Sequence, residues 1–405
     1  MKRLLPFFLL IPLASLACTS VIISHDKTAS GAPLMLKHRD TKSLNNEVRY
    51  IDGEKYTFIG LFNSQATVKE IWCGMNEVGF CIINTASYNF KEDNIPSSEM
   101  DQEAKVMYAA AGSCKTVDDF ERLLTNRKRP LGCETNFGVM DAQGGAAYFE
   151  TNNDRFVRYD IKDMPNLYRV ATNFSEAGRV KDRQGVERFL TATAIMKELS
   201  DANPDRLPID AQWIFDHFSL SYRHEVLHTA EDYVSASGWA VDQDFIPRRL
   251  TSSSIIFQGV KPGQDPKHTI MWALLGYPAC GVAIPLFVGP GKNILPTHVQ
   301  KAAGQATCAY TQTSNYIKNT YVFPLTAGNG NKYFNIGLIQ QGDDAHPALK
   351  TCAQTAQKKI NDLFLPLYND WCEGKITDKD FYSRYEAQTP LYYAYYLQAF
   401  APYIQ

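Results

Sequence analysis

The residue that most directly suggests chemistry is Cys18, because the segment before it is typical of an export signal. That segment has two basic residues near its start, an apolar run over residues 4–13 and small residues before the cysteine. The run is too short to cross a bilayer, which takes about 20 apolar residues. Cleavage after Ala17 therefore predicts a mature chain that begins with Cys18. A lipoprotein signal that acylates Cys18, giving a lipidated binding protein, is the rival interpretation, but Ser15 stands where such signals usually carry an aliphatic residue.

An N-terminal cysteine carries a nucleophile and a base on one residue. Its thiol lies beside a free α-amine, whose reference pKa is about 7.7 to 8.0. The amine takes the thiol proton directly or through a water, which is how N-terminal nucleophiles are activated. No separate histidine is needed, but three other groups are: one that orients the amine, a cation near the thiolate, and hydrogen-bond donors for an oxyanion.

The stretch "LMLKHRDT" contains the first two of these groups. Lys37 and Asp40 follow Cys18 by 19 and 22 residues. A strand, a turn and a returning strand of this length form a hairpin that brings the stretch back alongside the cysteine. Asparagine amides further along are candidates for the oxyanion donors: Asn84 lies in a later strand, and Asn173 lies at the end of another.

Residue patterns predict an α+β chain in which stacked sheets are covered by helices. Strands are expected at 19–24, 33–38, 56–62, 67–72, 80–86, 136–141, 146–150, 168–172, 253–258, 269–275 and 283–288. Helices are expected at 103–114, 117–126, 184–199, 211–218 and 348–371. The character of the sequence changes near Gly291, where "AAGQATCAYTQTSNY" is expected to be a loop and the tyrosine-rich end to belong to a helical addition.

Five motifs occur in one order: "CTSVIIS", "KHRD", "GMNEVGF", "NFGVMDAQGGAAYFE" and "ATNF". Taken together they make residues 18–288 resemble the choloylglycine hydrolase and penicillin V acylase group, and also the isopenicillin N acyltransferase-like proteins. These proteins are N-terminal nucleophile (Ntn) hydrolases, so the resemblance implies a four-layer αββα sandwich with a C-terminal helical extension. The chain then divides into a signal peptide (1–17), a catalytic domain (18–290) and a C-terminal part (291–405) that completes the fold with a helical addition.

The resemblance also implies roles for individual residues. Cys18 is the nucleophile, Asp40 holds the α-amine, and Asn173 contacts the oxyanion and the substrate. Arg188, in "VERF", corresponds to a later active-site arginine. The implied reaction is cleavage of a linear amide through a thioester acyl-enzyme, or acyl transfer through the same intermediate, and the sequence does not separate the two. No metal or organic cofactor is implied.

Two positions depart from the bile salt hydrolases of that group. Those enzymes have arginine where this chain has Lys37, which keeps the charge but loses the planar guanidinium fork. Their oxyanion asparagine lies about two residues after Asn84, where this chain has Ala86, although Asn84 shares that face of the strand. The first departure weighs against a bile acid substrate more than against the mechanism.

A metal-dependent alternative comes from "RHEVLHTAED", which contains the pattern HExxH in His224, Glu225 and His228. On a helix this pattern puts two imidazoles on one face for zinc, with the glutamate as base. The longer form of the motif is missing, because Glu231 stands where a glycine is expected and no third histidine follows. A zinc metallopeptidase is therefore the weaker alternative. In the resembled family this stretch is a loop near the site, where the two histidines are candidates to line the pocket.

The composition narrows the partners of the chain. It has 405 residues, a net charge of −2 and 21% charged residues, so neither nucleic acid nor an acidic membrane surface is an expected partner. Outside the signal, no apolar stretch is long enough to span a membrane. We expect an exported protein, periplasmic or extracellular, that acts on a small-molecule amide. Whether it forms a homo-oligomer stays open.

Cysteine usage leads to a further expectation. The chain has nine cysteines, and thiols in an oxidising compartment tend to pair. An odd number leaves at least one unpaired. With Cys18 as the unpaired residue, up to four disulfides are expected, of unknown connectivity. The absence of any CxxC pair argues against a zinc ribbon or a thioredoxin-like site.

Overall fold

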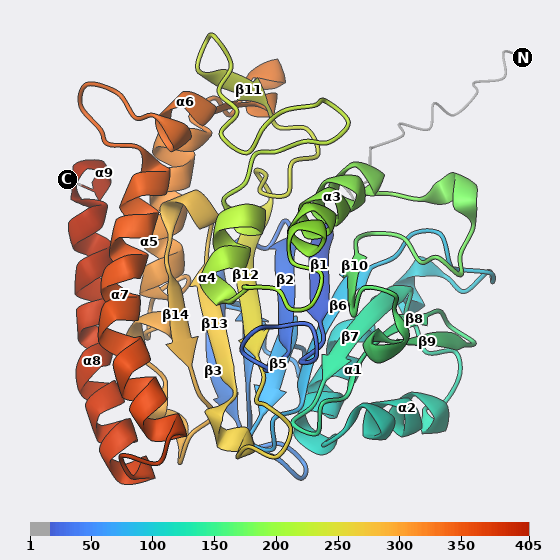
Figure 1. Cartoon of the computed structure of the whole chain (residues 1–405). Helices are drawn as coiled ribbons and strands as arrows, with labels where there is room; N and C mark the ends of the chain where they lie inside the picture. The colour runs from blue at the N-terminus through green and yellow to red at the C-terminus, as the bar shows by residue number, and fades with distance from the viewer. Residues whose placement is uncertain (1–16, 405) are drawn as a thin grey trace, which may run out of the picture.

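The computed structural model describes residues 17–404, so the predicted signal peptide lies outside the described residues except for Ala17. Two antiparallel sheets stack face to face, and helices cover the outer face of each sheet (Figure 1). The described chain therefore has the predicted αββα layers, with a further group of C-terminal helices at one edge. A small third sheet pairs β11 (Trp239–Val241) with β15 (Tyr333–Asn335).

The first large sheet has six strands and contains the predicted hairpin. In spatial order it consists of β10 (Tyr168–Ala171), β1 (Cys18–Ile23), β2 (Leu34–Asp40), β12 (Thr251–Gln258), β13 (Ile270–Leu275) and β14 (Ala283–Leu286). β1 and β2 are buried along their whole length, as expected for strands covered on both faces. In their antiparallel register Cys18 lies opposite Arg39 and Ser20 lies opposite Lys37.

The second large sheet has seven strands that follow the order of the chain. They are β3 (Asn46–Ile51), β4 (Phe58–Asn63), β5 (Cys73–Asn76), β6 (Cys81–Ala86), β7 (Thr135–Met140), β8 (Ala146–Thr151) and β9 (Phe156–Asp160). In this sheet, β6 lies close to both β1 and β2. Residues on β6 can therefore face residues on β2 across the interface between the sheets.

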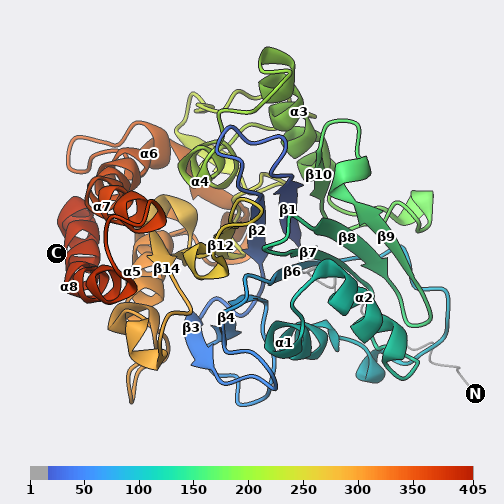
Figure 2. The ribbon, with the colours of Figure 1, turned by 60° about the horizontal axis from the view of Figure 1, so that its bottom comes forward.

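Two pairs of helices form the outer layers of the sandwich. α1 (Glu103–Ser113) and α2 (Val117–Asn126) cover the seven-stranded sheet, and Phe120 of α2 packs edge-on against Phe137 and Phe149 of that sheet. Thr116 is the N-cap of α2 and forms a capping box with Asp119. α3 (Val186–Ala202) and α4 (Ala211–Ile214) lie over the six-stranded sheet, on the opposite side of the molecule (Figure 2).

The C-terminal helices stand beside the edge strand β14 (Figure 1). They are α5 (Ala309–Ile317), α6 (Ile336–Gln340), α7 (Leu349–Cys372), α8 (Asp378–Ala399) and α9 (Ala401–Ile404). Three buried tyrosine hydroxyls of α8 and α9 donate hydrogen bonds to backbone carbonyls outside these helices: Tyr385 to Pro285 (2.6 Å), Tyr396 to Cys280 (2.8 Å) and Tyr403 to Pro347 (2.5 Å). One hydrophobic core contains side chains of these helices and of β1 and β2.

Several secondary-structure predictions were wrong in detail. The segment 67–72 is a loop rather than a strand, and the strand begins just after it as β5. The stretch expected to be a loop near residue 309 contains α5, whose buried face is made by Tyr310, Thr311, Ser314 and Ile317. The sequence pattern did not indicate this helix because two residues of its buried face, Thr311 and Ser314, are polar. Both are buried with their hydroxyls donating hydrogen bonds to backbone carbonyls. β3 and β9 were not predicted.

The expected disulfides are also absent. All nine cysteines are within the described residues, and all nine are free thiols. Eight are buried, and they behave as small apolar side chains within the core. Among residues 17–404, no helix is long and apolar enough to cross a membrane.

Candidate active site

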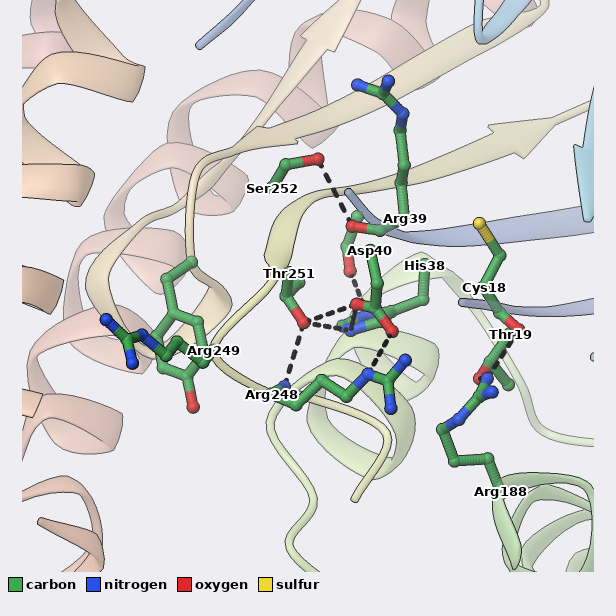
Figure 3. Close-up of polar contacts among 12 residues, drawn as sticks. Cys18, Thr19, His38, Arg39, Asp40, Arg188, Arg248, Arg249, Thr251 and Ser252 are labelled. Carbon is green, nitrogen blue, oxygen red and sulfur yellow. Dashed lines mark hydrogen bonds and ion pairs between the residues drawn. The ribbon is translucent and has the colours of Figure 1, made fainter. Parts of the chain in front are cut away.

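Cys18 opens β1 at the end of the sandwich, with 7% of its surface exposed. Residues opposite each other on antiparallel strands point to the same face of a sheet, and residues two apart on one strand do so as well. Cys18, Lys37 and Arg39 therefore share the face that looks toward the seven-stranded sheet. Figure 3 shows the Cys18 sulfur and the Arg39 guanidinium extending to the same side of their strands.

The thiol face of Cys18 thus carries two buried cations. The Lys37 ammonium donates hydrogen bonds to the Trp72 carbonyl and to Asn84 Oδ1. Burial lowers the pKa of Lys37 to about 8, an effect that the neighbouring Cys18 thiolate partly opposes. Burial also lowers the pKa of Arg39 to about 10, so both side chains are cations at neutral pH.

Arg39 is a site residue that the sequence interpretation did not single out. Its guanidinium donates hydrogen bonds to Asn46 Oδ1 and Asn63 Oδ1 (3.0 Å), and it lies over the Trp72 ring, with its carbon 4.4 Å from the ring centroid. The signal was present in "KHRD", because strand alternation puts the first and third of these residues on one face.

Asn173 and Arg188 surround the backbone of Cys18. Asn173 Oδ1 accepts hydrogen bonds from the Cys18 nitrogen (3.0 Å) and from Arg188 Nη2 (2.8 Å). Because a guanidinium only donates, the bond to Arg188 fixes which end of the carboxamide faces the nitrogen of Cys18. Arg188 Nη1 also donates to the Cys18 carbonyl (2.6 Å) and to Thr19 Oγ1 (3.0 Å). The structure thus brings together Cys18, Asn173 and Arg188, three of the residues singled out in the sequence.

Asp40 lies on the opposite face of β2 from Lys37, close to the residue that precedes Cys18. Its backbone nitrogen donates to the Ala17 carbonyl (2.9 Å). Its fully buried carboxylate accepts hydrogen bonds from Arg248 Nε (2.8 Å) and from Thr251 Oγ1 (2.7 Å), as Figure 3 shows. Arg248 was also missed in the sequence, although it stands just before a predicted strand whose start pairs with the end of β2.

The buried imidazole of His38 lies next to Thr251, the residue whose hydroxyl donates to Asp40. His38 Nε2 lies 3.1 Å from Thr251 Oγ1, and His38 Nδ1 lies 2.6 Å from Ser254 Oγ. Because the Thr251 hydroxyl donates its one proton to Asp40, His38 must donate through Nε2 and accept from Ser254 through Nδ1. Burial lowers the pKa of His38 to about 4, so the ring is neutral and the chain of donors from Ser254 to Asp40 is complete.

Asn84 lies next to Lys37, on β6 in the facing sheet. Its oxygen accepts from Lys37, and its nitrogen donates to Thr135 Oγ1 (3.1 Å). Both ends of the carboxamide are therefore engaged within the interface between the sheets. In this arrangement Asn84 positions the Lys37 ammonium.

The zinc alternative does not fit the structure. Residues 224–229 form a tight turn closed by a bridge between His224 and Thr229, and His228 has a left-handed backbone (φ 54°). His224 is buried, and its Nδ1 accepts a hydrogen bond from the Leu227 nitrogen (3.2 Å). The two imidazoles are not on one face of a helix, and within residues 17–404 no group of three His, Cys, Asp or Glu side chains is arranged to hold a metal ion.

The four layers, with a cysteine opening an inner strand, define the fold of an Ntn hydrolase. No family model and no curated protein sequence matches the chain. Among solved structures, it is similar to the Caenorhabditis elegans ortholog of N-acylethanolamine-hydrolyzing acid amidase, with 15% identity and a TM-score of 0.41 over 62% of this chain and 93% of that one.

Two further solved structures carry the names of families that the sequence motifs resemble. A conjugated bile acid hydrolase from Clostridium perfringens, in a mutant form, has 13% identity and a TM-score of 0.38 over 64% of this chain and 89% of its own. Penicillin V acylase from Agrobacterium tumefaciens has 14% identity and a TM-score of 0.38 over 66% of this chain and 86% of its own. At these scores the assignment of the fold depends on the topology of the chain itself.

Proposed function

We propose that this chain is an exported, cysteine-dependent amidohydrolase that cleaves linear, non-peptide amides through Cys18. One observation carries the proposal: the polar groups around Cys18 separate onto two sides of it. Lys37 and Arg39 share the face of its thiol, where cations favour the thiolate. Asn173 and Arg188 contact its backbone, where an acceptor orients the nitrogen that becomes the α-amine.

In the proposed reaction, removal of residues 1–17 frees the α-amine of Cys18, which takes the proton of the thiol. The thiolate attacks the substrate carbonyl, so that a C–S bond forms and the π electron pair moves to the oxygen. The carboxamide nitrogen of Asn173 and a backbone amide are the proposed donors to this oxyanion. When the intermediate collapses, the C–N bond breaks and the α-ammonium gives its proton to the leaving amine.

Water completes the cycle. The α-amine takes a proton from water, the resulting hydroxide attacks the thioester, and the C–S bond breaks to release a carboxylic acid and the thiol. Asp40 is proposed to hold the α-ammonium, because its backbone already contacts Ala17 at the bond that must be cut. Its carboxylate is held in turn by Arg248 and Thr251.

The test begins with the exported protein of the native host. N-terminal sequencing and intact mass should give residues 18–405 with an unmodified Cys18. Wild type should then release amines from a panel of N-acyl amines and N-acyl amino acids, and Cys18→Ser should not. Cys372→Ser, which changes a half-buried thiol on α7, is the matched control and should keep wild-type activity.

Two results would contradict the proposal. Acyl chains on Cys18, or a retained leader, remove the base that the mechanism needs. Unchanged turnover by Cys18→Ser would show that the Cys18 thiol is not the nucleophile. If a new amide forms when a primary amine is added, the chain transfers the acyl group through the same thioester. Mass spectrometry of the quenched enzyme should detect this thioester as an adduct on Cys18.

A further inference from the structure

The two side chains that hold the Asp40 carboxylate belong to one tight turn, which we call the 248–251 turn. The Thr251 nitrogen donates to the Arg248 carbonyl (2.8 Å), and the Arg248 nitrogen donates to Thr251 Oγ1 (2.9 Å). From this turn, Arg248 Nε and Thr251 Oγ1 reach the carboxylate (Figure 3). The position of the Asp40 carboxylate therefore depends on the position of the turn.

Charged side chains hold both ends of the backbone of Arg249, inside the 248–251 turn. Its carbonyl accepts a hydrogen bond from Lys318 Nζ (3.0 Å), and its nitrogen donates to the Asp242 carboxylate (3.2 and 3.1 Å to the two oxygens). Its guanidinium also donates to the Asn331 carbonyl (2.8 Å). Hydrogen bonds to charged groups are roughly twice as strong as those between neutral groups, so these contacts hold the turn firmly.

Lys318 extends from a fixed point in the C-terminal part of the chain. It directly follows α5, and 1% of its surface is exposed. α5 is bound to the sandwich one and two helical turns earlier: Ser314 Oγ accepts from the Tyr277 nitrogen (2.9 Å), and Thr311 Oγ1 donates to the Asn46 carbonyl (2.9 Å). The lysine therefore connects an anchored helix to the 248–251 turn.

Packing alone does not explain a lysine at this position. Burial lowers the pKa of Lys318 to about 8, which shows that a charge here costs free energy. An apolar side chain of the same length would fill the space without that cost. A neutral amine still donates an N–H group, so the contact with the Arg249 carbonyl does not require the charge.

We propose that Lys318 is a positioning residue: through the 248–251 turn, it keeps Asp40 where the carboxylate holds the α-ammonium of Cys18. The inference rests on the proposed amidohydrolase function, in which Asp40 has that role. Lys318 acts on Asp40 through the backbone of Arg249. The C-terminal part of the chain therefore supports the active site, although its helices stand beside the edge strand β14.

The test compares two variants with the amide that wild type cleaves most rapidly. Lys318→Met removes the donor at nearly equal length and should lower kcat per folded enzyme by about 10- to 100-fold, as expected when a catalytic group shifts by about 1 Å. KM should stay within about twofold, because the substrate binds on the thiol side of Cys18. Lys318→Gln keeps an N–H donor, so it should recover part of the loss, and it serves if Lys318→Met does not fold. Lys358→Met, which removes an exposed lysine of α7, is the matched control and should behave as wild type.

A double-mutant cycle separates positioning from general destabilisation. Lys318→Met is combined with Arg248→Lys, and kcat is measured for all four proteins. If both changes act through the 248–251 turn, the double variant should be about as slow as the slower single variant. Losses that multiply, or a kcat within about twofold of wild type for both Lys318 variants, would overturn the inference.

Alkylation of Cys18 by iodoacetamide gives a readout that needs no substrate. In the processed protein the rate should fall about threefold or more at pH 7 in Lys318→Met, because an amine that Asp40 no longer holds takes the thiol proton less readily. Peptide mass spectrometry distinguishes Cys18 from the other eight thiols. An unchanged rate would overturn the inference, whereas failure of wild type to cleave any amide would overturn the proposed function.

Discussion

The Lys37 ammonium gives a pH dependence that can be worked out from its surroundings. It lies on the thiol face of Cys18, and burial lowers its pKa to about 8. The thiolate needs a cation beside it, so activity should fall as Lys37 loses its proton. We expect the alkaline limb of kcat/KM to have its midpoint near pH 8 in wild type, whereas deprotonation of the α-amine sets the acidic limb.

The size of the effect follows from two other groups in the site. Arg39 and Arg188 are also fully buried, and burial lowers the pKa of each to about 10. An arginine in place of Lys37 should therefore titrate near that value, and Lys37→Arg should move the alkaline midpoint upward by about two pH units. At pH 9 about nine tenths of the wild-type enzyme should have lost the Lys37 proton, since roughly one lysine in ten keeps its proton one unit above its pKa.

The assay is kcat/KM from pH 6 to 10.5 with one amide, in buffers of constant ionic strength. Asn84→Asp is a second variant of nearly equal volume: it puts a carboxylate on Lys37, which should raise the lysine pKa by about 1 to 3 units and move the limb the same way. An alkaline midpoint that stays near pH 8 in both active variants would refute the reasoning and assign that limb to another group.

Three other outcomes are expected. Arg248→Leu should destabilise the protein by about 3 to 5 kcal/mol in urea unfolding, because it leaves the buried Asp40 carboxylate without its ion pair; Arg248→Lys should cost less. Thr251→Val should lower kcat by at least about tenfold and destabilise the fold, since it removes the hydroxyl that donates to Asp40, whereas Thr251→Ser should restore both. Dithiothreitol should leave the Tm of the protein within about 1 °C, because all nine cysteines are unpaired; a marked fall would contradict the free thiols.

The opening hairpin could be predicted from the sequence because its determinants are local. A run of β-branched and aliphatic residues after Cys18, a turn and a second aliphatic run fix both strands. The distance from Cys18 to "KHRD" then brings Lys37 and Arg39 to its side. The same reasoning did not reach Arg248, because its contact with Asp40 depends on how a strand more than 200 residues later pairs with β2.

Elements were missed where tertiary contacts override local pattern. α5 reads as polar and loop-like, yet Thr311 and Ser314 are buried by hydrogen bonds to distant backbone carbonyls. β3 begins with Asn46, which is fully buried because Arg39 and a backbone carbonyl satisfy its carboxamide. The prediction of disulfides was wrong for a related reason. The sequence gives the number of cysteines, but the fold determines whether two thiols lie close enough to bond.

The tyrosines that tie α8 and α9 to the rest of the chain bear on how the protein unfolds. The hydroxyls of Tyr385 and Tyr396 donate to backbone carbonyls at or near β14. The rings of these two tyrosines are fully buried in the core that also contains the aliphatic side chains of β1 and β2. The C-terminal helices therefore cannot detach without opening the core beneath the nucleophile. We expect the described chain to melt in one cooperative transition, and a truncation before α7 to aggregate rather than to yield a smaller stable enzyme.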